Sequence, residues 1–369
     1  MDNSPADGAV PLERFTAHDD RIIEPGDLDW PVEVPPFRDE RFRSLWHKVQ
    51  YFALRGAQGG ALALPRPLRS GVVRSLAALG RVCDRRHTEA ARTFISAAFP
   101  EYSAAEVQGV VKEAWRHLMR VALVSEGVSK HVMGRRLGDH YDIYMDPAAR
   151  ELLGSGQGVM LITGHVGHWE ASCPGVTTVG FRPAYAIGKA PRNDYVAQHI
   201  QRMREGQGMR LIPRKGAMQA VPQAIRGGSN VGMLMDHRPR QKPLIAPFFG
   251  RPAGCDRSAG VLIRRVKAPL VFYGCYGAPG TDPLRDWRFE LRFPRVIHPE
   301  ELSGLGPVEV ATRVNRELEA LIRYRPNEVF WLHDRFRDAP ATFEKASNEP
   351  KGESLSGSAQ GAASASPGD

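Results

Sequence analysis

The segment that indicates the fold is residues 158–170, GVMLITGHVGHWE. An uncharged apolar run, Gly158–Thr163, is followed at once by glycines, two histidines and an acid. The run is far shorter than the ~20 apolar residues that a membrane-spanning helix needs, so it predicts a buried strand that ends in a turn. Ligands of open α/β sheets bind beyond the carboxyl ends of the strands, which makes this turn a candidate site.

Short apolar runs and amphipathic segments alternate from this point onward. Five further runs follow the first: Pro183–Ile187, Arg210–Pro213, Asn230–Met235, Pro269–Cys275 and Arg288–Phe293. Helical patterns fall near residues 168–180, 192–205, 217–226, 257–266 and 308–323. This alternation predicts an α/β fold with a mostly parallel central sheet flanked by helices.

Residues 41–138 have a helical pattern instead. Ser103 and Glu106 have the spacing of a capping box and predict the start of one helix. Upstream, apolar residues at three- and four-residue spacing, with arginines between them, predict an amphipathic helix: Leu68, Val72, Leu76, Leu79 and Val82. Two interpretations stay open, an arginine-rich solvated face over a core or a helix that lies on an anionic membrane surface.

Composition divides the chain into three parts. Residues 1–40 are acidic and contain several prolines, which predicts a mostly irregular arm. Residues 345–369 are a low-complexity Ser/Gly/Ala segment and predict a disordered tail. Between them we expect one domain, residues 41–344, with a helical region (41–138) and an α/β core (139–344).

Charge is distributed unevenly over these parts. The chain of 369 residues has a net charge of +9, yet its first 40 residues hold three arginines and eleven acids, and its last 25 hold two lysines and three acids. The other 304 residues carry 45 basic and 27 acidic side chains, a balance of +18. Such a body should bind an anionic partner: nucleic acid, phospholipid headgroups, a phosphorylated small molecule or an acidic protein.

Several classes of protein are disfavoured. The four cysteines form no CxxC pair, which argues against a zinc ribbon or a disulfide scaffold and fits a reducing compartment. The acidic N-terminus does not read as a signal peptide. The best early candidate for a membrane span, residues 51–65, is interrupted by Arg55 and three glycines. Membrane contact is therefore expected to be interfacial.

The turn after the first run holds a possible catalytic pair, His165 and Glu170. The His-x4-acid spacing occurs twice, here and at His333–Asp338, but only the first follows a predicted buried strand. Residues five apart on one helix point about 140° away from each other, so the pair can meet only if His165 lies in the turn and Glu170 begins the next helix. A carboxylate on one ring nitrogen would leave the other free as a base.

Two other interpretations of the same residues remain. In the first, His165 is a buried histidine that bonds to a backbone carbonyl. In the second, His165, His168 and Glu170 ligate a metal. The metal is disfavoured because no other cluster of His, Cys or Asp supplies a further ligand.

Several sequence blocks occur in a fixed order between about residues 85 and 337. Arg85-Arg86 leads through Phe99-Pro100-Glu101 to Ser103–Glu106, and Gly164–Glu170 follows. The later blocks are Gly208–Arg214, Gly232–Asp236, Phe248–Ala253 and Pro326–Arg337. In this order they resemble the bacterial lipid A biosynthesis acyltransferases of the LpxL/LpxM (HtrB) type, within the lysophospholipid acyltransferase superfamily. In the GHxGNWE block of that family this chain has His168 where Asn is usual.

The resemblance implies an O-acyltransferase that needs no metal or other cofactor. A fatty acyl group would pass from the thioester of acyl carrier protein or CoA to a hydroxyl of a membrane glycolipid such as a lipid A precursor. His165 would be the general base and Glu170 would stabilise the imidazolium. Backbone N–H groups near Gly167 would hold the oxyanion.

Three further residues come from the same blocks. Arg214 would bind a phosphate of the donor or acceptor. Asp236 follows a predicted strand and would orient Arg214 or the substrate, or else cap a helix. Arg335, in the closing block, is a weaker candidate for substrate binding and has a structural role as its alternative.

The implied partners are acyl carrier protein, an anionic membrane surface and a lipid acceptor, and not nucleic acid. The implied location is the cytoplasmic face of the inner membrane, with peripheral or interfacial anchoring. Two departures from the family, the interrupted N-terminal span and the segment Gly254–Ser258, leave the acceptor open. A phosphatidylinositol mannoside, an ornithine lipid or a lysophospholipid are alternatives, and a metal-dependent hydrolase or a basic binding protein without activity are more distant ones.

Overall fold

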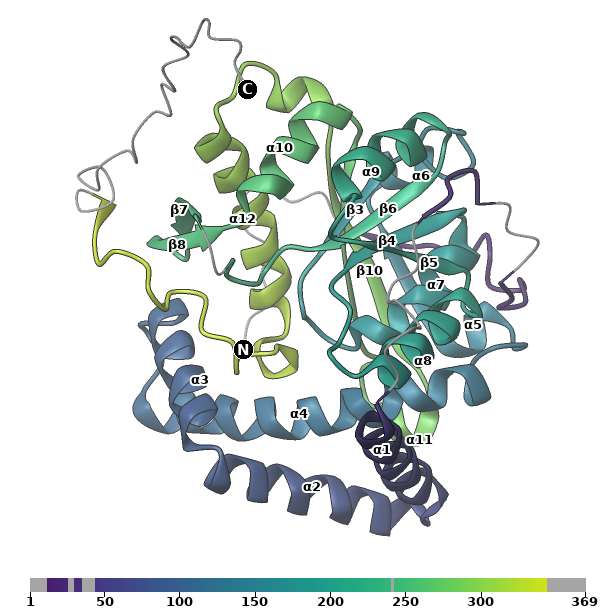
Figure 1. Cartoon of the computed structure of the whole chain (residues 1–369), viewed down its shortest axis with the longest axis vertical. Coiled ribbons are helices and arrows are strands. Elements are labelled where there is room, and N and C mark those ends of the chain that lie inside the picture. Colours follow the sequence, from purple (N-terminus) through teal and green to yellow (C-terminus); the bar gives the residue numbers. More distant parts are fainter. Residues whose placement is uncertain (1–11, 26–29, 35–43, 240–241, 344–369) are drawn as a thin grey trace, which may run out of the picture.

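A central eight-stranded sheet organises the molecule. The computed structural model describes residues 12–25, 30–34, 44–239 and 242–343 (Figure 1). The strand order is β1-β2-β10-β9-β3-β6-β4-β5. In chain order these strands are β1 (Glu13–Arg14), β2 (Tyr141–Met145), β3 (Met160–Thr163), β4 (Ala184–Gly188), β5 (Met209–Pro213), β6 (Asn230–Leu234), β9 (Leu270–Gly277) and β10 (Phe289–Ile297).

The sheet is mostly parallel. β9, β3, β6, β4 and β5 run in one direction, and β2 is parallel to β10. Among the described strands of this sheet, the pairs β10–β9 and β1–β2 are the antiparallel ones. The predicted α/β fold with a mostly parallel sheet is confirmed, and each of the six predicted apolar runs overlaps a strand of this sheet.

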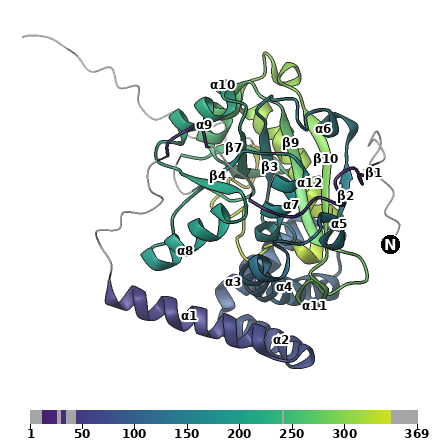
Figure 2. The same cartoon turned by 90° about the vertical axis from the view of Figure 1, so that its right-hand side faces the viewer.

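Helices lie on both faces of the sheet (Figures 1 and 2). The five predicted helical segments correspond to α7 (Ser172–Val179), α8 (Asp194–Glu205), α9 (Ala217–Arg226), α10 (Arg257–Val266) and α12 (Pro307–Tyr324). Short elements complete the core: α5 (Leu137–His140), α6 (Pro147–Glu151), α11 (Pro283–Asp286) and the 3-10 turns η1 (Trp169–Ala171), η2 (Pro299–Leu302) and η3 (Pro326–Glu328).

The buried strand β3 shows how the two faces become two cores. Met160 and Ile162 pack in one cluster of buried residues, while Leu161 points to the other face and packs with Tyr141 and Val176. Side chains alternate between the faces of a strand, so a strand covered on both sides must be apolar throughout. This is why GVMLIT reads as a continuous apolar run and not as an alternating one.

Sequence patterns did not identify β2 or a separate two-stranded hairpin, β7 (Leu244–Phe248) with β8 (Arg251–Cys255). The hairpin strands contain Pro247 and Pro252, directly opposite each other, and Gly254. Proline lacks an N–H for pairing, and both residue types are depleted in strands, so the local signal for a strand is weak.

Four helices form the N-terminal region: α1 (Leu45–Ala63), α2 (Arg66–Cys83), α3 (Arg85–Ala98) and α4 (Ala104–His131). The predicted capping box is present at the start of α4, where Ser103 and Glu106 bond reciprocally. Figure 2 shows α1 and α2 extending along one side of the molecule. Within the described part of the chain, no helix has the length and apolar character to span a bilayer.

The apolar stripe of α2 faces outward. Leu68 and Leu79 are 57% and 59% exposed, and Leu76 and Val82 are exposed as well. The buried residues of α2 are Val73 and Ala77. The interpretation of the stripe as a core face under a solvated arginine face is therefore wrong. Amphipathicity showed that the helix has an apolar side, but the rest of the molecule packs on a different one.

Part of the acidic arm packs against the domain. Phe15, Ile23 and Val32 are buried, and β1 pairs with β2 at the sheet edge. The remainder of the arm (residues 1–11, 26–29 and 35–40) and the predicted tail (345–369) lie outside the described residues.

Candidate active site

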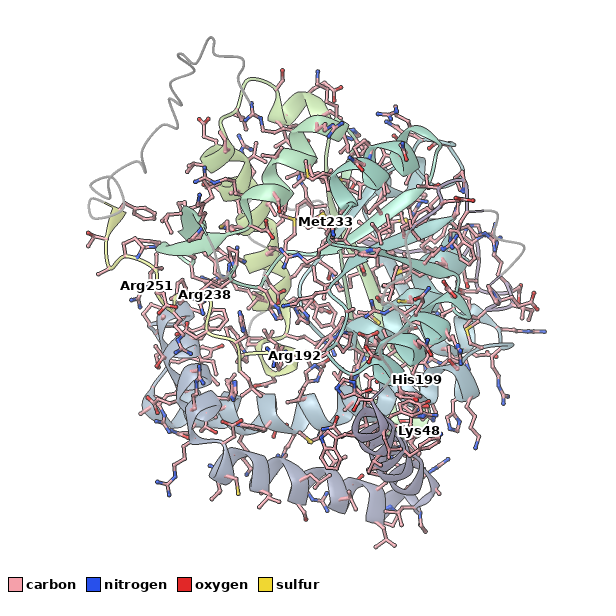
Figure 3. All side chains as sticks on the ribbon, viewed as in Figure 1. Lys48, Arg192, His199, Met233, Arg238 and Arg251 are labelled. Carbon is pink, nitrogen blue, oxygen red and sulfur yellow. The ribbon has the colours of Figure 1, made fainter. Side chains whose placement is uncertain are left out.

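A cavity of about 360 Å³ opens beyond the carboxyl ends of β3, β4, β5 and β6. Its wall includes His165 after β3, Lys189 after β4, Arg214 after β5 and His237 after β6. Met233 and Arg238, labelled in Figure 3, also line it. The cavity lies beyond the strand ends, where the sequence analysis placed the candidate site, because the parallel strands end at one edge.

Asp236 holds His165 through two hydrogen bonds. The Nδ1 atom of His165 lies 2.8 Å from Oδ1 of Asp236, and the backbone N–H of His165 donates to Oδ2 at 2.6 Å. A carboxylate can only accept, so Nδ1 carries the proton and the lone pair of the neutral ring is on Nε2. His165 therefore has the tautomer that a general base requires.

The sheet register brings these two residues together. β3 and β6 are parallel neighbours with Thr163 opposite Leu234, so the chain leaves both strands at the same level. Gly164 sits between the strand and His165, where a Cβ would lie 3.1 Å from the Asp236 side chain. The glycine allows the close approach of the carboxylate to the turn.

Asp236 remains a carboxylate. Burial alone would raise its pKa, but the electrostatic interaction with His165 and the two hydrogen bonds from that residue outweigh burial and hold the pKa of Asp236 well below its usual range. A buried carboxylate beside an imidazole stabilises the imidazolium that forms when the ring takes up a proton.

The sequence analysis had expected Glu170 to bond to His165, but the two residues have different partners. Its carboxylate accepts from Nε and Nη2 of Arg204 on α8, at 3.1 and 2.6 Å. Glu170 lies in η1, as the bend required, but the Nδ1 atom of His165 bonds to Asp236 instead. Burial would lower the pKa of Arg204, but the charge of Glu170 outweighs burial and raises that pKa, so Arg204 stays ionised.

Gly167 allows the backbone of the turn to adopt its conformation and to pack closely against Cys275. Its φ is +57°, a value that favours glycine, and a Cβ would lie 1.9 Å from the carbonyl oxygen of Cys275. The N–H of Gly167 donates to the carbonyl of Glu328, and the N–H of His168 to that of Cys275, both at 2.5 Å. The backbone N–H groups of His165, Gly167 and His168 are therefore already bonded, and these three donors are not free for an oxyanion.

Arg214 lies at the cavity wall and is half exposed, but its partner is not Asp236. Its Nη2 forms an ion pair with Asp256, the N-cap residue of α10. Lys189, Arg204 and Arg238 also line the cavity, so its wall has an excess of basic side chains over its one lining carboxylate, Asp256. Arg204 and Arg238 are themselves paired, with Glu170 and Asp338. The sequence identified Arg214 and did not single out the other three basic residues, because lysine and arginine are common elsewhere in the chain.

Arg335 is 1% exposed and is not among the residues that line this cavity. Its Nη2 donates to Oδ1 of Asn315 at 2.7 Å, and its guanidinium carbon lies 4.1 Å from the centre of the Phe248 ring. These contacts are structural: they join α12, the β7–β8 hairpin and the closing block.

His237 is a site residue that the sequence analysis missed. Its ring stacks on that of His165, with centroids 3.8 Å apart and an angle of 7° between the planes. Burial lowers the pKa of His237 to about 3, so it is a neutral neighbour of the base. Its position directly after Asp236, at the end of β6, was the signal available.

Two groups of side chains have donor atoms within 4.8 Å of one another among the described residues. They are His165 with Asp236 and His237, and His117 with His168 and Glu328. The metal set considered from the sequence, His165 with His168 and Glu170, is not one of these groups.

The parallel sheet, the strand-end cavity and the oriented histidine define an α/β protein with an ordered histidine in a basic pocket. Residues 40–338 match the sequence model of the bacterial lipid A biosynthesis acyltransferases. The chain therefore belongs to this family, as the motif resemblance had indicated.

Two curated proteins are similar at low identity. The lipid A biosynthesis palmitoleoyltransferase of Escherichia coli (strain K12) is 23% identical over 284 residues, which cover 75% of this chain and 87% of that protein. The lipid A biosynthesis acyltransferase of Shigella flexneri gives the same values.

Proposed function

We propose that this acyltransferase moves a fatty acyl group from the thioester of acyl carrier protein or CoA to a hydroxyl of a lipid A precursor. The observation that carries this proposal is the tautomer of His165, which leaves Nε2 free to take a proton at the edge of a basic cavity. A lipid hydroxyl is a weak nucleophile near neutral pH, and a positioned base contributes about 10²–10⁴-fold.

In the proposed reaction, Nε2 of His165 takes the hydroxyl proton while the oxygen forms a bond with the thioester carbon. The C–S bond then breaks, and the imidazolium returns the proton to the leaving thiolate. Asp236 stabilises the imidazolium between these steps.

We assign stabilisation of the oxyanion to Arg204. Three backbone donors of the turn, those of His165, Gly167 and His168, are used internally. Arg204 lines the cavity and is held by two hydrogen bonds from its side chain to Glu170. In this proposal Glu170 is a positioning residue that acts through Arg204, and not the partner of His165. An arginine held by a bidentate carboxylate has a fixed direction, which is what stabilisation of a developing charge requires.

Lys189, Arg214 and Arg238 are proposed to hold phosphates of the acceptor or of the donor's prosthetic arm. Asp256 neutralises part of this charge through its ion pair with Arg214, and it belongs to the segment Gly254–Ser258 that departs from the family pattern. This observation favours a second candidate, an acceptor other than lipid A, such as a phosphatidylinositol mannoside, an ornithine lipid or a lysophospholipid.

We further propose that α1 and α2 rest on the cytoplasmic face of the inner membrane. Exposed apolar residues lie on both helices, among them Trp46 and Phe52 on α1 and Leu68 and Leu79 on α2. Arginines occur between them, and the body of the chain is basic. Apolar side chains with flanking cations are typical of helices that bind anionic lipid interfacially.

Acyl transfer by the purified full chain tests the proposal. With acyl carrier protein thioester and a lipid A precursor, His165→Ala should lose at least about 100-fold in rate, while His87→Ala on the exposed side of α3 retains it. Full activity of a folded His165→Ala protein would contradict the mechanism. Mass spectrometry of lipids from a deletion strain identifies the acceptor, and an unaltered lipid A would reject the first candidate.

A further inference from the structure

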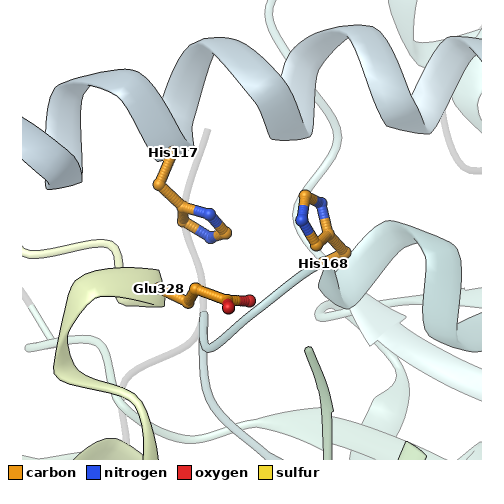
Figure 4. Close-up of side chains that lie close together, drawn as sticks. All are labelled: His117, His168 and Glu328. Carbon is orange, nitrogen blue, oxygen red and sulfur yellow. The ribbon is translucent and has the colours of Figure 1, made fainter. Parts of the chain in front are cut away.

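Three side chains meet on the far side of the turn that carries His165. His117 comes from α4, His168 precedes η1, and Glu328 ends η3, and their donor atoms all lie within 4.8 Å of one another. Figure 4 shows them converging from these three elements. None of them lines the cavity of the active site.

His168 has an unsatisfied nitrogen. The residue is 2% exposed, and its Nδ1 has no hydrogen-bond partner. A buried polar atom without a partner loses its hydrogen bonds to water and gains none in return, so a partner is expected. His168 is also the position at which this chain departs from the GHxGNWE block.

His117 has a free lone pair in the same place. The residue is 2% exposed, and its Nε2 lies 2.9 Å from the carbonyl oxygen of Gly167. A carbonyl only accepts, so Nε2 carries the proton and Nδ1 of the neutral ring carries the lone pair. A histidine that donates one ring N–H to a backbone carbonyl has the arrangement usual for a metal ligand.

Glu328 brings negative charge and is itself oriented. Its Oε2 accepts from the N–H of Gly277 at 2.9 Å, and its Oε1 from Arg325 at 3.2 Å. Each oxygen keeps a further acceptor site.

We propose that His117, His168 and Glu328 bind one transition-metal ion, zinc by preference. Two His and one carboxylate are a known ligand set for zinc, with a fourth position left to water. Donors on one tetrahedral zinc lie about 3.4 Å apart, since Zn–N bonds are about 2.1 Å, so side-chain shifts on the order of 1 Å close the site. The ion would tie α4 and η3 to the turn before η1 and does not take part in acyl transfer.

Metal analysis of the full chain, purified with a tag free of histidine, tests this site. We expect about one zinc per chain in the purified protein. If the protein is first treated with EDTA, it should bind about one equivalent of added zinc, and its melting temperature should rise. His168→Asn should weaken zinc binding at least 10-fold. Glu328→Gln, which preserves the size of the side chain, should weaken zinc binding as well. It serves as the test if His168→Asn fails to fold.

Two controls separate this site from the active site. His87→Asn, on an exposed histidine, and His165→Ala should retain the metal. Loss of zinc in His165→Ala but not in His168→Asn would place the ion at the His165 group and overturn the proposal. So would an EDTA-treated wild type that binds zinc no better than the His168→Asn protein. The result does not depend on acyl transfer, so either proposal can fail alone.

Discussion

Asp236 determines which nitrogen of His165 is available as a base. It bonds to Nδ1 and to the backbone N–H of the same residue, so it fixes both the ring and the turn. Sequence alone located His165 and listed Asp236, but it chose Glu170 as the partner. The two carboxylates could not be distinguished from spacing, because the contact with Asp236 is made across 71 residues by neighbouring parallel strands.

We therefore expect Asp236→Asn to lower kcat by about 10²–10⁴-fold, since an amide neither fixes this tautomer nor stabilises an imidazolium. Steady-state kinetics with acyl carrier protein thioester measure the effect, and circular dichroism checks the fold. A variant with wild-type kcat would show that the carboxylate has no part in the reaction.

Glu170→Gln and Arg204→Gln should each lower the rate of acyl transfer, and their effects should not add, because in our proposal Glu170 acts through Arg204. The double variant is expected to be no slower than the worse single variant, which is the signature of coupled residues. The same rate measurement decides this. Losses that multiply would indicate that the two residues act independently.

Acid should destabilise the protein through His117 and His168. Burial holds the pKa of both below 6.5, that of His168 well below it. Below about pH 6.5 the unfolded chain binds protons that the folded chain does not, so the free energy of unfolding falls as the pH is lowered. Urea titrations with EDTA from pH 7.5 to 5 should show a flatter fall for His168→Asn, and an unchanged slope would contradict this.

At the level of elements, the amphipathic pattern of α2 predicted a helix but not the direction of its apolar side. That direction depends on which face α4 covers, and the pattern of one helix holds no information about its neighbour. The strands of the central sheet were predictable because burial on both faces makes them continuous apolar runs. The β7–β8 hairpin was not, because its prolines and glycine carry the signal of a turn.

The outward stripe of α2 makes a direct prediction. Leu68→Ser together with Leu79→Ser should weaken binding to vesicles that contain anionic lipid at least 10-fold, because burial of a leucine contributes about 1.5–3 kcal/mol. Both residues are exposed, so the free energy of unfolding should change little. Flotation with vesicles measures the binding.

Val308→Ser is the matched control, because Val308 is an exposed apolar residue on α12. It should leave vesicle binding unchanged. An equal loss in this control, or no loss in the double variant, would count against α2 as the membrane contact.

At the scale of the whole molecule, the acidic arm is in part integral to the domain. Ile23 is fully buried, while its neighbour Ile22 is 45% exposed. Ile23→Ala should cost about 2–5 kcal/mol of unfolding free energy, and Ile22→Ala less than about 0.5 kcal/mol. Urea denaturation compares the two. Equal effects would mean that the arm does not pack as described.

The turn at Gly167 has a consequence for the rate of the reaction. It is held by β9 on one side and by η3 on the other, and Asp236 holds the residue two positions earlier. In the proposed mechanism, Nε2 of His165 thus loses its freedom of movement when the chain folds, before the acceptor binds. The entropy of aligning a base with a hydroxyl is then a cost of folding and not of each turnover.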